Sequence, residues 1–326
     1  MRAFVTGATG FVGSHLVREL AGRGVVVSCL VRNEAKASRV LAGMTYEPIR
    51  GNLEDQRALE DGCADADIVF HVAGAVTARS EREFHSINVE ATTRLLHAAE
   101  RSGGIERLVY VSSLAAAGPS TVDRAHGDAS GGVPITHYGR SKLAGENEVR
   151  GTDLPWTIVR PPTVYGPRDV ELFKVFQLAK LRIAPLFGTG AQRLSLVYVE
   201  DLAVALVTAA LATPPRRAYY ACHPEIVTAR ELAIGIYRAT TESTGTPIVL
   251  PVPRPIAMGV LALTQGMASL AGRATLLTLD KGAEFFAPAW TCTAEALKAD
   301  SGWKAATGLA EGLSKTADWY RENGWL

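Results

Sequence analysis

The sequence predicts an α/β fold in which helices cover both faces of a doubly wound parallel sheet, with a smaller, mostly C-terminal lobe attached. Short apolar runs recur in the first half of the chain, and they predict buried strands at residues 3–6, 25–31, 68–73, 107–113 and 156–161. Segments with helical periodicity lie between these runs, such as 13–24 and 88–103, and they end near glycines. Strands that alternate with helices pair in parallel through right-handed crossovers, which defines this fold class.

The second half of the chain differs from the first in its residue pattern. After residues 159–169 the alternation stops, proline and glycine become frequent, and 250–259 resembles a rigid connector. Residues 199–214 have helical periodicity and are expected to return to the first domain. The predicted boundaries are 1–165 plus 201–215 for the first domain and 166–200 plus 216–326 for the lobe. The loop 118–136, rich in Gly, Pro, Ser and Asp, is a candidate lid.

Composition narrows the class of partner. A chain of 326 residues can bury a large core. Its 34 Lys and Arg nearly balance its 33 Asp and Glu, so no overall field attracts nucleic acid or an anionic membrane. The expected partner is a small molecule or a second copy of the chain.

Cysteine and histidine spacing predicts neither a metal site nor disulfides. The four cysteines and seven histidines form no cluster with ligand spacing, and a reducing cytoplasm fits the cysteine pattern best. Residues 1–10 enter a strand pattern directly, without the apolar region of a secretory signal. The apolar stretch 256–272 is too short and too interrupted to span a bilayer. We interpret it as a helix of the lobe, with the alternative that it rests on a membrane or a greasy ligand.

A glycine-rich turn follows the first predicted strand. Gly7, Gly10 and Gly13 stand where a strand gives way to a helix, with Thr9, Phe11 and Val12 in the same turn. Such glycines allow a tight turn and a close backbone approach to a pyrophosphate, and the helix N-terminus offers its free amides to the phosphates. This context predicts that the first domain binds a dinucleotide.

The end of the second predicted strand indicates which dinucleotide is bound. An NAD site usually carries an acid there for the ribose hydroxyls, but this chain has Arg32, with Lys36 nearby. A cation suits a 2′-phosphate, so NADP is favoured. The alternative is that Arg32 is a solvated loop charge and that the site takes NAD.

The motifs together resemble an extended short-chain dehydrogenase/reductase of the NAD(P)-dependent epimerase/dehydratase superfamily. They are TGATGFVG (6–13), GNLED (51–55), HVAGA (71–75), NVEATTRLL (88–96), VYVSSLAAAG (109–118), YGRSK (138–142), RPPTVYGP (160–167), LVYVEDLA (196–203) and WYRENGWL (319–326). The resemblance implies a Rossmann sheet with a substrate-binding lobe. It also implies the family's catalytic set, which corresponds to Ser113, Tyr138 and Lys142.

The spacing of this set suits proton transfer. Residues four apart share a helix face, so Tyr138 and Lys142 are expected to point into one cleft. A neighbouring ammonium and the positive nicotinamide ring favour phenolate and are expected to lower the pKa of Tyr138. Tyr138 then exchanges a proton with the substrate oxygen, which Ser113 holds by a hydrogen bond. The resemblance adds that Lys142 holds the nicotinamide ribose.

The resemblance also implies further cofactor-binding positions. They are Asn52, Leu53, Ala73, Gly74, Ala75, Asn88, Val111, Ser112, Pro161, Thr163 and Val164, in addition to the turn residues, Arg32, Tyr138 and Lys142. Asn52 departs from the more usual Asp at that position.

Three departures from nucleotide-sugar enzymes favour another substrate. Leu194 stands where those enzymes commonly carry an arginine for the substrate diphosphate, although Arg193 lies beside it. Leu114 and Ala115 replace the acid pair typical of dehydratases. Arg32 favours NADP, whereas epimerases usually hold NAD. Residues 71–88 also resemble the 3β-hydroxysteroid dehydrogenase and dihydroflavonol reductase branch.

We therefore expect an NADP-dependent oxidoreductase that interconverts a hydrophobic ketone and a secondary alcohol, with tyrosine as proton donor or acceptor. The alternative is an NAD-dependent nucleotide-sugar epimerase or dehydratase, and a third hypothesis is a cofactor-sensing protein without turnover. The resemblance further implies a homodimer that pairs through the helix carrying Tyr138 and Lys142.

Overall fold

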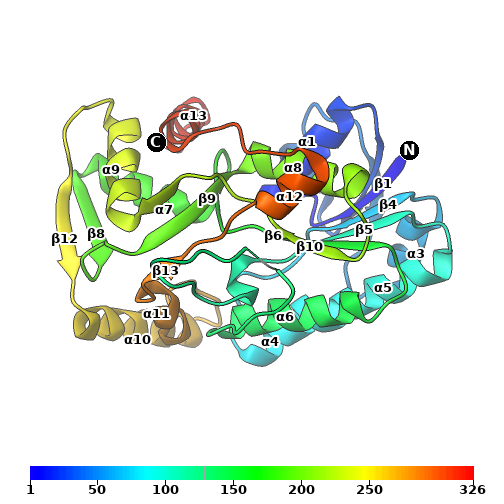
Figure 1. Ribbon diagram of the computed structural model, residues 1–326, viewed down its shortest axis with the longest axis horizontal. Helices are drawn as coiled ribbons and strands as arrows, with labels where there is room; N and C mark the ends of the chain where they lie inside the picture. Colours follow the sequence, from blue (N-terminus) through cyan, green and yellow to red (C-terminus); the bar gives the residue numbers. More distant parts are fainter. Residues whose placement is uncertain (128) are drawn as a thin grey trace.

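A parallel sheet of seven strands forms the larger part of the molecule (Figure 1). The computed structural model describes residues 1–127 and 129–326. The strand order is β10-β6-β5-β4-β1-β2-β3, and every neighbouring pair runs parallel. The strands are β1 (Arg2–Thr6), β2 (Val26–Val31), β3 (Glu47–Arg50), β4 (Ile68–His71), β5 (Arg107–Val111), β6 (Trp156–Arg160) and β10 (Arg217–Tyr220). The predicted doubly wound α/β class is confirmed.

Helices cover both faces of this sheet (Figure 1). On one face lie α1 (Phe11–Gly22), α2 (Glu34–Val40), α8 (Val199–Ala212) and α12 (Glu295–Ser301), and on the other lie α3 (Gln56–Ala64), α5 (Ala91–Ser102) and α6 (His137–Arg150). Successive side chains of a strand point to opposite faces, so Phe4 packs into one apolar core and Val5 into the other. Both faces are buried, which explains why the central strands read as continuous apolar runs.

Two edge strands were absent from the sequence prediction. β3 is largely exposed and carries charged residues, so it lacks an apolar run. β10 pairs with β6 in the main sheet, although the predicted boundary placed residues from 216 onward in the lobe. Leu297 and Trp303, from the region of α12, also join the core beside α8. These segments pack against the first domain, although the predicted boundary assigns them to the lobe. The division of the chain into two domains stays a prediction.

The remaining elements form a lobe around short strands. One small sheet has the order β11-β9-β13 with β7 paired to β9, and β8 pairs with β12. The elements are β7 (Thr163–Tyr165), α7 (Val170–Lys180), β8 (Ile183–Phe187), β9 (Arg193–Tyr198), β11 (Ile226–Thr228), α9 (Ala229–Thr241), β12 (Ile248–Val252), α10 (Arg254–Leu270), α11 (Leu279–Phe285), β13 (Ala289–Trp290) and α13 (Leu309–Glu322). Tyr165, Phe176 and Tyr320 form the centre of its core.

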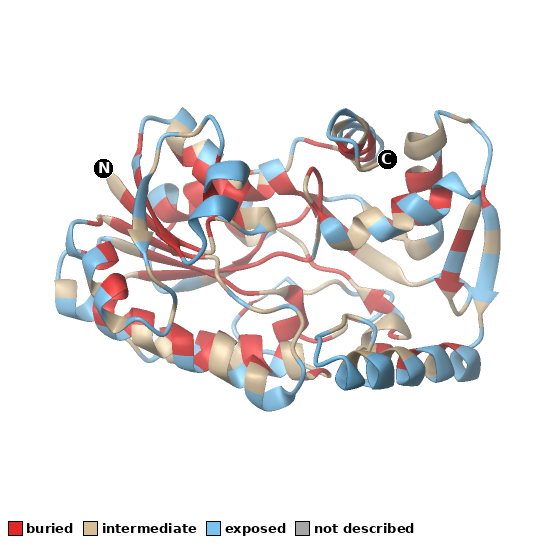
Figure 2. Cartoon of the chain, turned by 180° about the vertical axis from the view of Figure 1, so that it is seen from behind, coloured by how far each residue is buried: buried red, intermediate tan, exposed pale blue. Residues whose placement is uncertain are grey.

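The apolar stretch predicted at 256–272 forms helix α10. The helix lies at the edge of the lobe, and most of its length is exposed when the molecule is seen from behind (Figure 2). Within residues 1–127 and 129–326, no helix combines the length and the apolar composition needed to cross a bilayer.

The candidate lid at 118–136 is attached to the lobe by hydrogen bonds. Ser120 and His126 bridge to Ala289 and Cys292 beside β13, and the Ser120 hydroxyl bonds that of Thr291 at 2.8 Å. Asp128, within this loop, lies outside the described residues. The attachment joins the described part of this loop to the segment of β13.

Candidate active site

The glycine-rich turn leaves no room for side chains. Gly7, at the end of β1, has a φ of +76°, and a Cβ there would lie 2.6 Å from the Ala73 nitrogen. A Cβ on Gly13 would lie 2.1 Å from the carbonyl oxygen of Gly7. Gly10 is the N-cap of α1 and has no side chain to occupy the first-turn amides. The bare helix terminus and the close backbone therefore fit a dinucleotide pyrophosphate.

The loop after β4 faces this turn and is held by Asn88. Asn88 is buried in a π-helical turn, Ser86–Glu90. Its Oδ1 accepts from the Ala75 amide at 2.8 Å, and its Nδ2 donates to the Ala75 carbonyl and to the Ser141 hydroxyl. A Cβ on Gly74 would lie 3.0 Å from that Oδ1. Asn88 thus shapes the loop of Ala73, Gly74 and Ala75, and the buried Ser141 supports it.

The adenine side of the turn is open to solvent. Arg32 is exposed directly after β2, next to Asn33, which caps α2. Asn52 is exposed, and its Oδ1 accepts from the Glu54 amide at 2.7 Å, while Leu53 packs against the core. Arg32 and Asn52 therefore follow the ends of neighbouring parallel strands, as the family resemblance implies.

Ser113 and Tyr138 are brought together by the end of β5 and the start of α6. Ser113 caps a 3-10 turn, Leu114–Ala116, by accepting from the Ala115 amide at 3.1 Å. Thr136 caps α6 by accepting from the Gly139 amide, which places Tyr138 in the first turn of the helix. Both side chains line one cavity, so the structure brings together the serine and the tyrosine of the predicted set.

In the protein alone, burial raises the pKa of Tyr138 to about 12, and the nearby Ser113 hydroxyl opposes this only in part. The expected lowering of this pKa relied on the nicotinamide ring as well as on an ammonium. Lys142 does not lower it, because its ammonium donates to the Val111 carbonyl at 2.7 Å and lies 4.4 Å from the centre of the Tyr110 ring. The phenol is thus protonated at neutral pH.

Lys142 itself is buried beneath the loop of residues 73–75. Burial lowers its pKa to about 8, although Glu146 one turn further along α6 acts to raise it. A Cβ on Gly74 would lie 3.6 Å from its Nζ. Lys142 therefore reaches the cofactor-side loop and the end of β5.

Ser112 points away from this loop. Its hydroxyl donates to the Glu146 carboxylate, which also forms a two-point ion pair with Arg160 at 2.7 Å. All three side chains are buried. This cluster ties α6 to β6, which supports a structural role for Arg160, and it places the Ser112 hydroxyl in the core.

A cavity of about 390 Å³ opens beside Ser113 and Tyr138. Its walls are mostly apolar and come from the lobe as well as from the first domain; they include Leu114, Ala115, Pro162, Thr163, Pro185, Leu186, Phe187, Leu194, Phe285 and Trp290. Pro161 and Val164, beside Pro162 and Thr163, are largely buried, and the Pro161 carbonyl accepts from the Leu114 amide. Leu194 faces the cavity, whereas the Arg193 guanidinium donates to the Val122 carbonyl.

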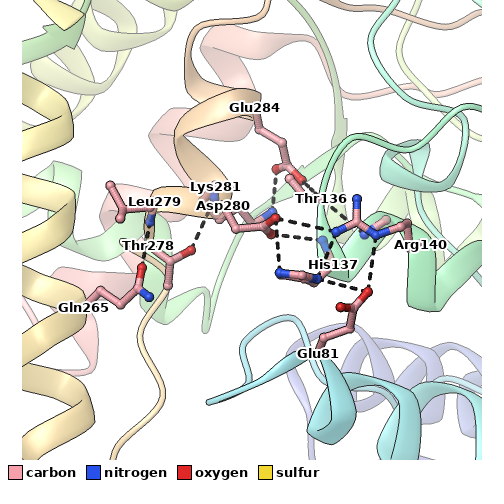
Figure 3. Close-up of polar contacts among 11 residues, drawn as sticks. Glu81, Thr136, His137, Arg140, Gln265, Thr278, Leu279, Asp280, Lys281 and Glu284 are labelled. Atoms are coloured by element: carbon pink, nitrogen blue, oxygen red, sulfur yellow. Dashed lines mark hydrogen bonds and ion pairs between the residues drawn. The ribbon is translucent and has the colours of Figure 1, made fainter. Parts of the chain in front are cut away.

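Helix α11 closes over the start of α6 (Figure 3). Asp280 accepts from the His137 amide at 2.9 Å, and Glu284 accepts from the Thr136 hydroxyl at 2.6 Å. Lys281 pairs with Glu284 and lies 5.0 Å from the centre of the Tyr138 ring. Sequence reasoning missed Lys281 and Glu284, because no spacing pattern links α11 to α6.

His137 belongs to the same network and not to the cavity beside Ser113. Its Nδ1 lies 3.1 Å from the Glu81 carboxylate, on helix α4 (Glu81–His85), and Arg140 also pairs with Glu81.

His71, at the end of β4, is buried between the hydroxyls of Thr6 and Thr92. Among the described residues no group of three or more His, Cys, Asp or Glu side chains is arranged to hold a metal ion.

The glycine turn, the Ser113–Tyr138 contact and the parallel sheet together define an enzyme that uses a nicotinamide dinucleotide. The chain belongs to the NAD-dependent epimerase/dehydratase family, whose model matches residues 3–221. It is an NAD(P)-dependent reductase or dehydrogenase.

Named relatives agree with this class. The chain is 32% identical to a ceramide reductase of Caulobacter vibrioides, over 99% of this chain and 95% of that protein. It is 36% identical to the 4-hydroxy-2-methyl-3-oxo-4-farnesyl-3,4-dihydroquinoline-1-oxide ketoreductase of Stigmatella aurantiaca, over 52% of each chain. The solved structure of MoeE5 in complex with UDP-glucose and NAD resembles this fold with a TM-score of 0.76, at 25% identity and 99% coverage of both chains.

Proposed function

We propose that the protein is an NADP-dependent oxidoreductase that interconverts a hydrophobic ketone and a secondary alcohol. The observation that carries the proposal is the cavity that Ser113 and Tyr138 line together, whose walls are mostly apolar. Leu194 in that wall offers no charge for a diphosphate, and the Lys281 ammonium in the same wall is paired with Glu284. The names of two relatives refer to hydrophobic compounds, a ceramide in one and a farnesylated dihydroquinoline oxide in the other. Both names support the same substrate class.

The proposed roles follow from the geometry of the three side chains. The bound nicotinamide supplies or accepts the hydride. Tyr138 donates its proton to the substrate oxygen during reduction, and its raised pKa keeps it in the donor form at neutral pH. Ser113 holds the same oxygen by a hydrogen bond. Lys142, below the loop of residues 73–75, would contact the nicotinamide ribose.

NADP is the cofactor that we propose, because Arg32 offers an exposed cation at the end of β2. The turn at Gly7, Gly10 and Gly13 would hold the pyrophosphate, and the loop shaped by Asn88 would line the cofactor chain. A cytoplasmic location, which fits the cysteine pattern, and a homodimer formed through α6, which the family resemblance implies, are further proposals.

A screen of NADPH oxidation tests the reaction. The panel comprises ketosteroids, flavonoid ketones, β-keto acyl compounds, a ketone analogue of a ceramide, and nucleotide sugars. We expect turnover with at least one hydrophobic ketone and none with the sugars. Turnover confined to nucleotide sugars would refute the proposal.

A nucleotide-sugar epimerase is the second candidate, because the fold also matches a protein solved with UDP-glucose and NAD. Such an enzyme recycles its cofactor and retains it. Extraction of the purified protein followed by nucleotide analysis separates the two candidates: one equivalent of retained NAD would favour the epimerase, and an empty or NADP-exchanging site would favour the reductase.

A further inference from the structure

Helix α10 carries an uncovered apolar face. Its members recur at intervals of three or four residues and therefore lie on one side of the helix: Ile256, Val260, Leu263, Met267 and Leu270. Their exposure ranges from 52% for Val260 to 92% for Leu270. We call these five side chains the α10 apolar face.

The helix attaches to the protein by a different side. Ala257 and Leu261 are its fully buried residues, and Gln265 accepts from the Leu279 amide at the start of α11. A surface helix normally turns its polar side to water, whereas α10 turns five large apolar side chains outward. Figure 2 shows the helix exposed along most of its length at the rim of the lobe. Such a face needs an occupant other than water.

The charge around the helix favours an anionic occupant. Residues 243–279 contain no Asp or Glu, and their only ionised side chains are Arg254 at the start of α10 and Arg273 shortly after its end. Both arginines are exposed. Asp280, the next acid along the chain, is directed toward His137 and Arg140 of α6. An apolar face flanked by cations is typical of a helix that lies in a membrane interface.

The same features disfavour a second copy of this chain as the occupant. A helix of 17 residues is about 26 Å long and about 10 Å wide, so its face offers roughly 260 Å². A stable interface buries about 800 Å² on each partner. Pairing two such helices in either direction would also bring arginines together without acids from this segment to neutralise them.

We propose that the α10 apolar face docks the protein on the surface of an anionic lipid bilayer, with the helix lying in the plane of the interface. The inner side of α10 contributes Gln265 to a cavity of about 290 Å³, which Tyr138 and Leu279 also line. Docking would therefore place the α10 side of this cavity next to the lipid. The proposal goes beyond the reaction, since membrane binding is measured without any turnover.

Vesicle co-sedimentation tests the proposal directly. The full chain is mixed with vesicles of equal parts phosphatidylcholine and phosphatidylglycerol, and with vesicles of phosphatidylcholine alone. We expect binding to the anionic vesicles, weakened by added salt and much weaker without the anionic lipid. Replacing both Leu263→Gln and Met267→Gln should lower this binding about tenfold or more, because two apolar side chains leave the interface. Leu211→Gln, at a half-exposed leucine of α8, is the control and should bind like the wild type.

A labelled variant keeps the test independent of the double substitution. All four native cysteines are buried, so Leu270→Cys accepts a polarity-sensitive fluorophore selectively. A blue shift of its emission on anionic vesicles is expected, with no shift for a label at Leu211→Cys. Absence of vesicle binding, or binding that the double substitution leaves intact, would overturn the proposal. So would a dimer in size-exclusion chromatography that the double substitution dissociates while no vesicles are bound, because the face would then belong to a second copy.

Discussion

Ser113, Tyr138 and Lys142 show how much a family resemblance can predict at the level of residues. All three were identified from matching motifs, and the separation of four between Tyr138 and Lys142 explains why both can serve one site. The structure places Ser113 and Tyr138 in the wall of the same cavity, and their catalytic roles stay a proposal. The expected lowering of the Tyr138 pKa depends on the positive nicotinamide ring, whereas in the protein alone burial raises this pKa, and burial cannot be read from the neighbouring residues in the chain.

Replacing Tyr138→Phe removes the proposed proton donor and little else. Turnover of the hydrophobic ketone should fall on the order of a hundredfold or more, while NADPH binding followed by fluorescence stays unchanged. Undiminished turnover would exclude Tyr138 as the donor. Loss of both turnover and binding would point to a structural effect instead.

Arg32→Asp exchanges the exposed cation at the end of β2 for an acid. The ratio of kcat/KM for NADPH over NADH should fall about tenfold or more, because an acid repels the 2′-phosphate and accepts from a free ribose hydroxyl. Arg101→Asp, at an exposed position on α5, serves as the control and should leave the ratio as it is. If the ratio of kcat/KM for NADPH over NADH is the same in both variants, Arg32 is a surface charge without a role in cofactor choice.

At the level of elements, apolar runs predicted the strands that have neighbours on both sides. β1, β4 and β5 lie inside the sheet, so both faces of each strand are apolar and the signal is continuous. The edge strands β3 and β10 carry polar or charged residues and left no such signal. Helix α11 was likewise missed as part of the site, because it reaches α6 from about 140 residues further along the chain.

The turn between β1 and α1 should tolerate no added carbon at Gly13. Gly13→Ala places a Cβ against the Gly7 carbonyl, and the resulting backbone shift should lower the free energy of unfolding by about 1–3 kcal/mol. NADPH affinity should fall about tenfold or more, since the phosphate cradle moves with it. Gly22→Ala, at the end of the same helix, meets nothing within 4 Å and should change neither quantity much. Thermal melting with and without NADPH measures both effects.

For the whole molecule, the buried His71 couples folding to pH. Burial lowers its pKa from about 6.5 to about 3, so the folded chain stays unprotonated there while the unfolded chain takes up a proton below pH 6.5. Stability should therefore fall as the pH drops from 6.5 toward 3, by about 1.4 kcal/mol per pH unit from this group. His15, whose pKa burial lowers to about 4, acts in the same direction.

Urea unfolding between pH 7 and 5 measures this slope. His71→Gln should flatten the fall of the unfolding free energy by about 2 kcal/mol between pH 6.5 and 5, whatever its effect at pH 7. The exposed His97→Gln serves as the control and should keep the wild-type slope. If the unfolding free energy falls with pH equally in all three proteins, His71 takes up its proton in the folded chain over the same pH range as in the unfolded chain.

The cavity draws its proposed reacting groups and most of its apolar walls from different parts of the chain. Ser113 and Tyr138 belong to the first domain, whereas Leu186, Phe187 and Phe285 belong to the lobe. A combinatorial library that randomised only those wall positions would leave the proposed proton-transfer pair and the proposed dinucleotide turn intact. Directed evolution of substrate scope in this scaffold can therefore proceed in the lobe while the reaction type is inherited unchanged.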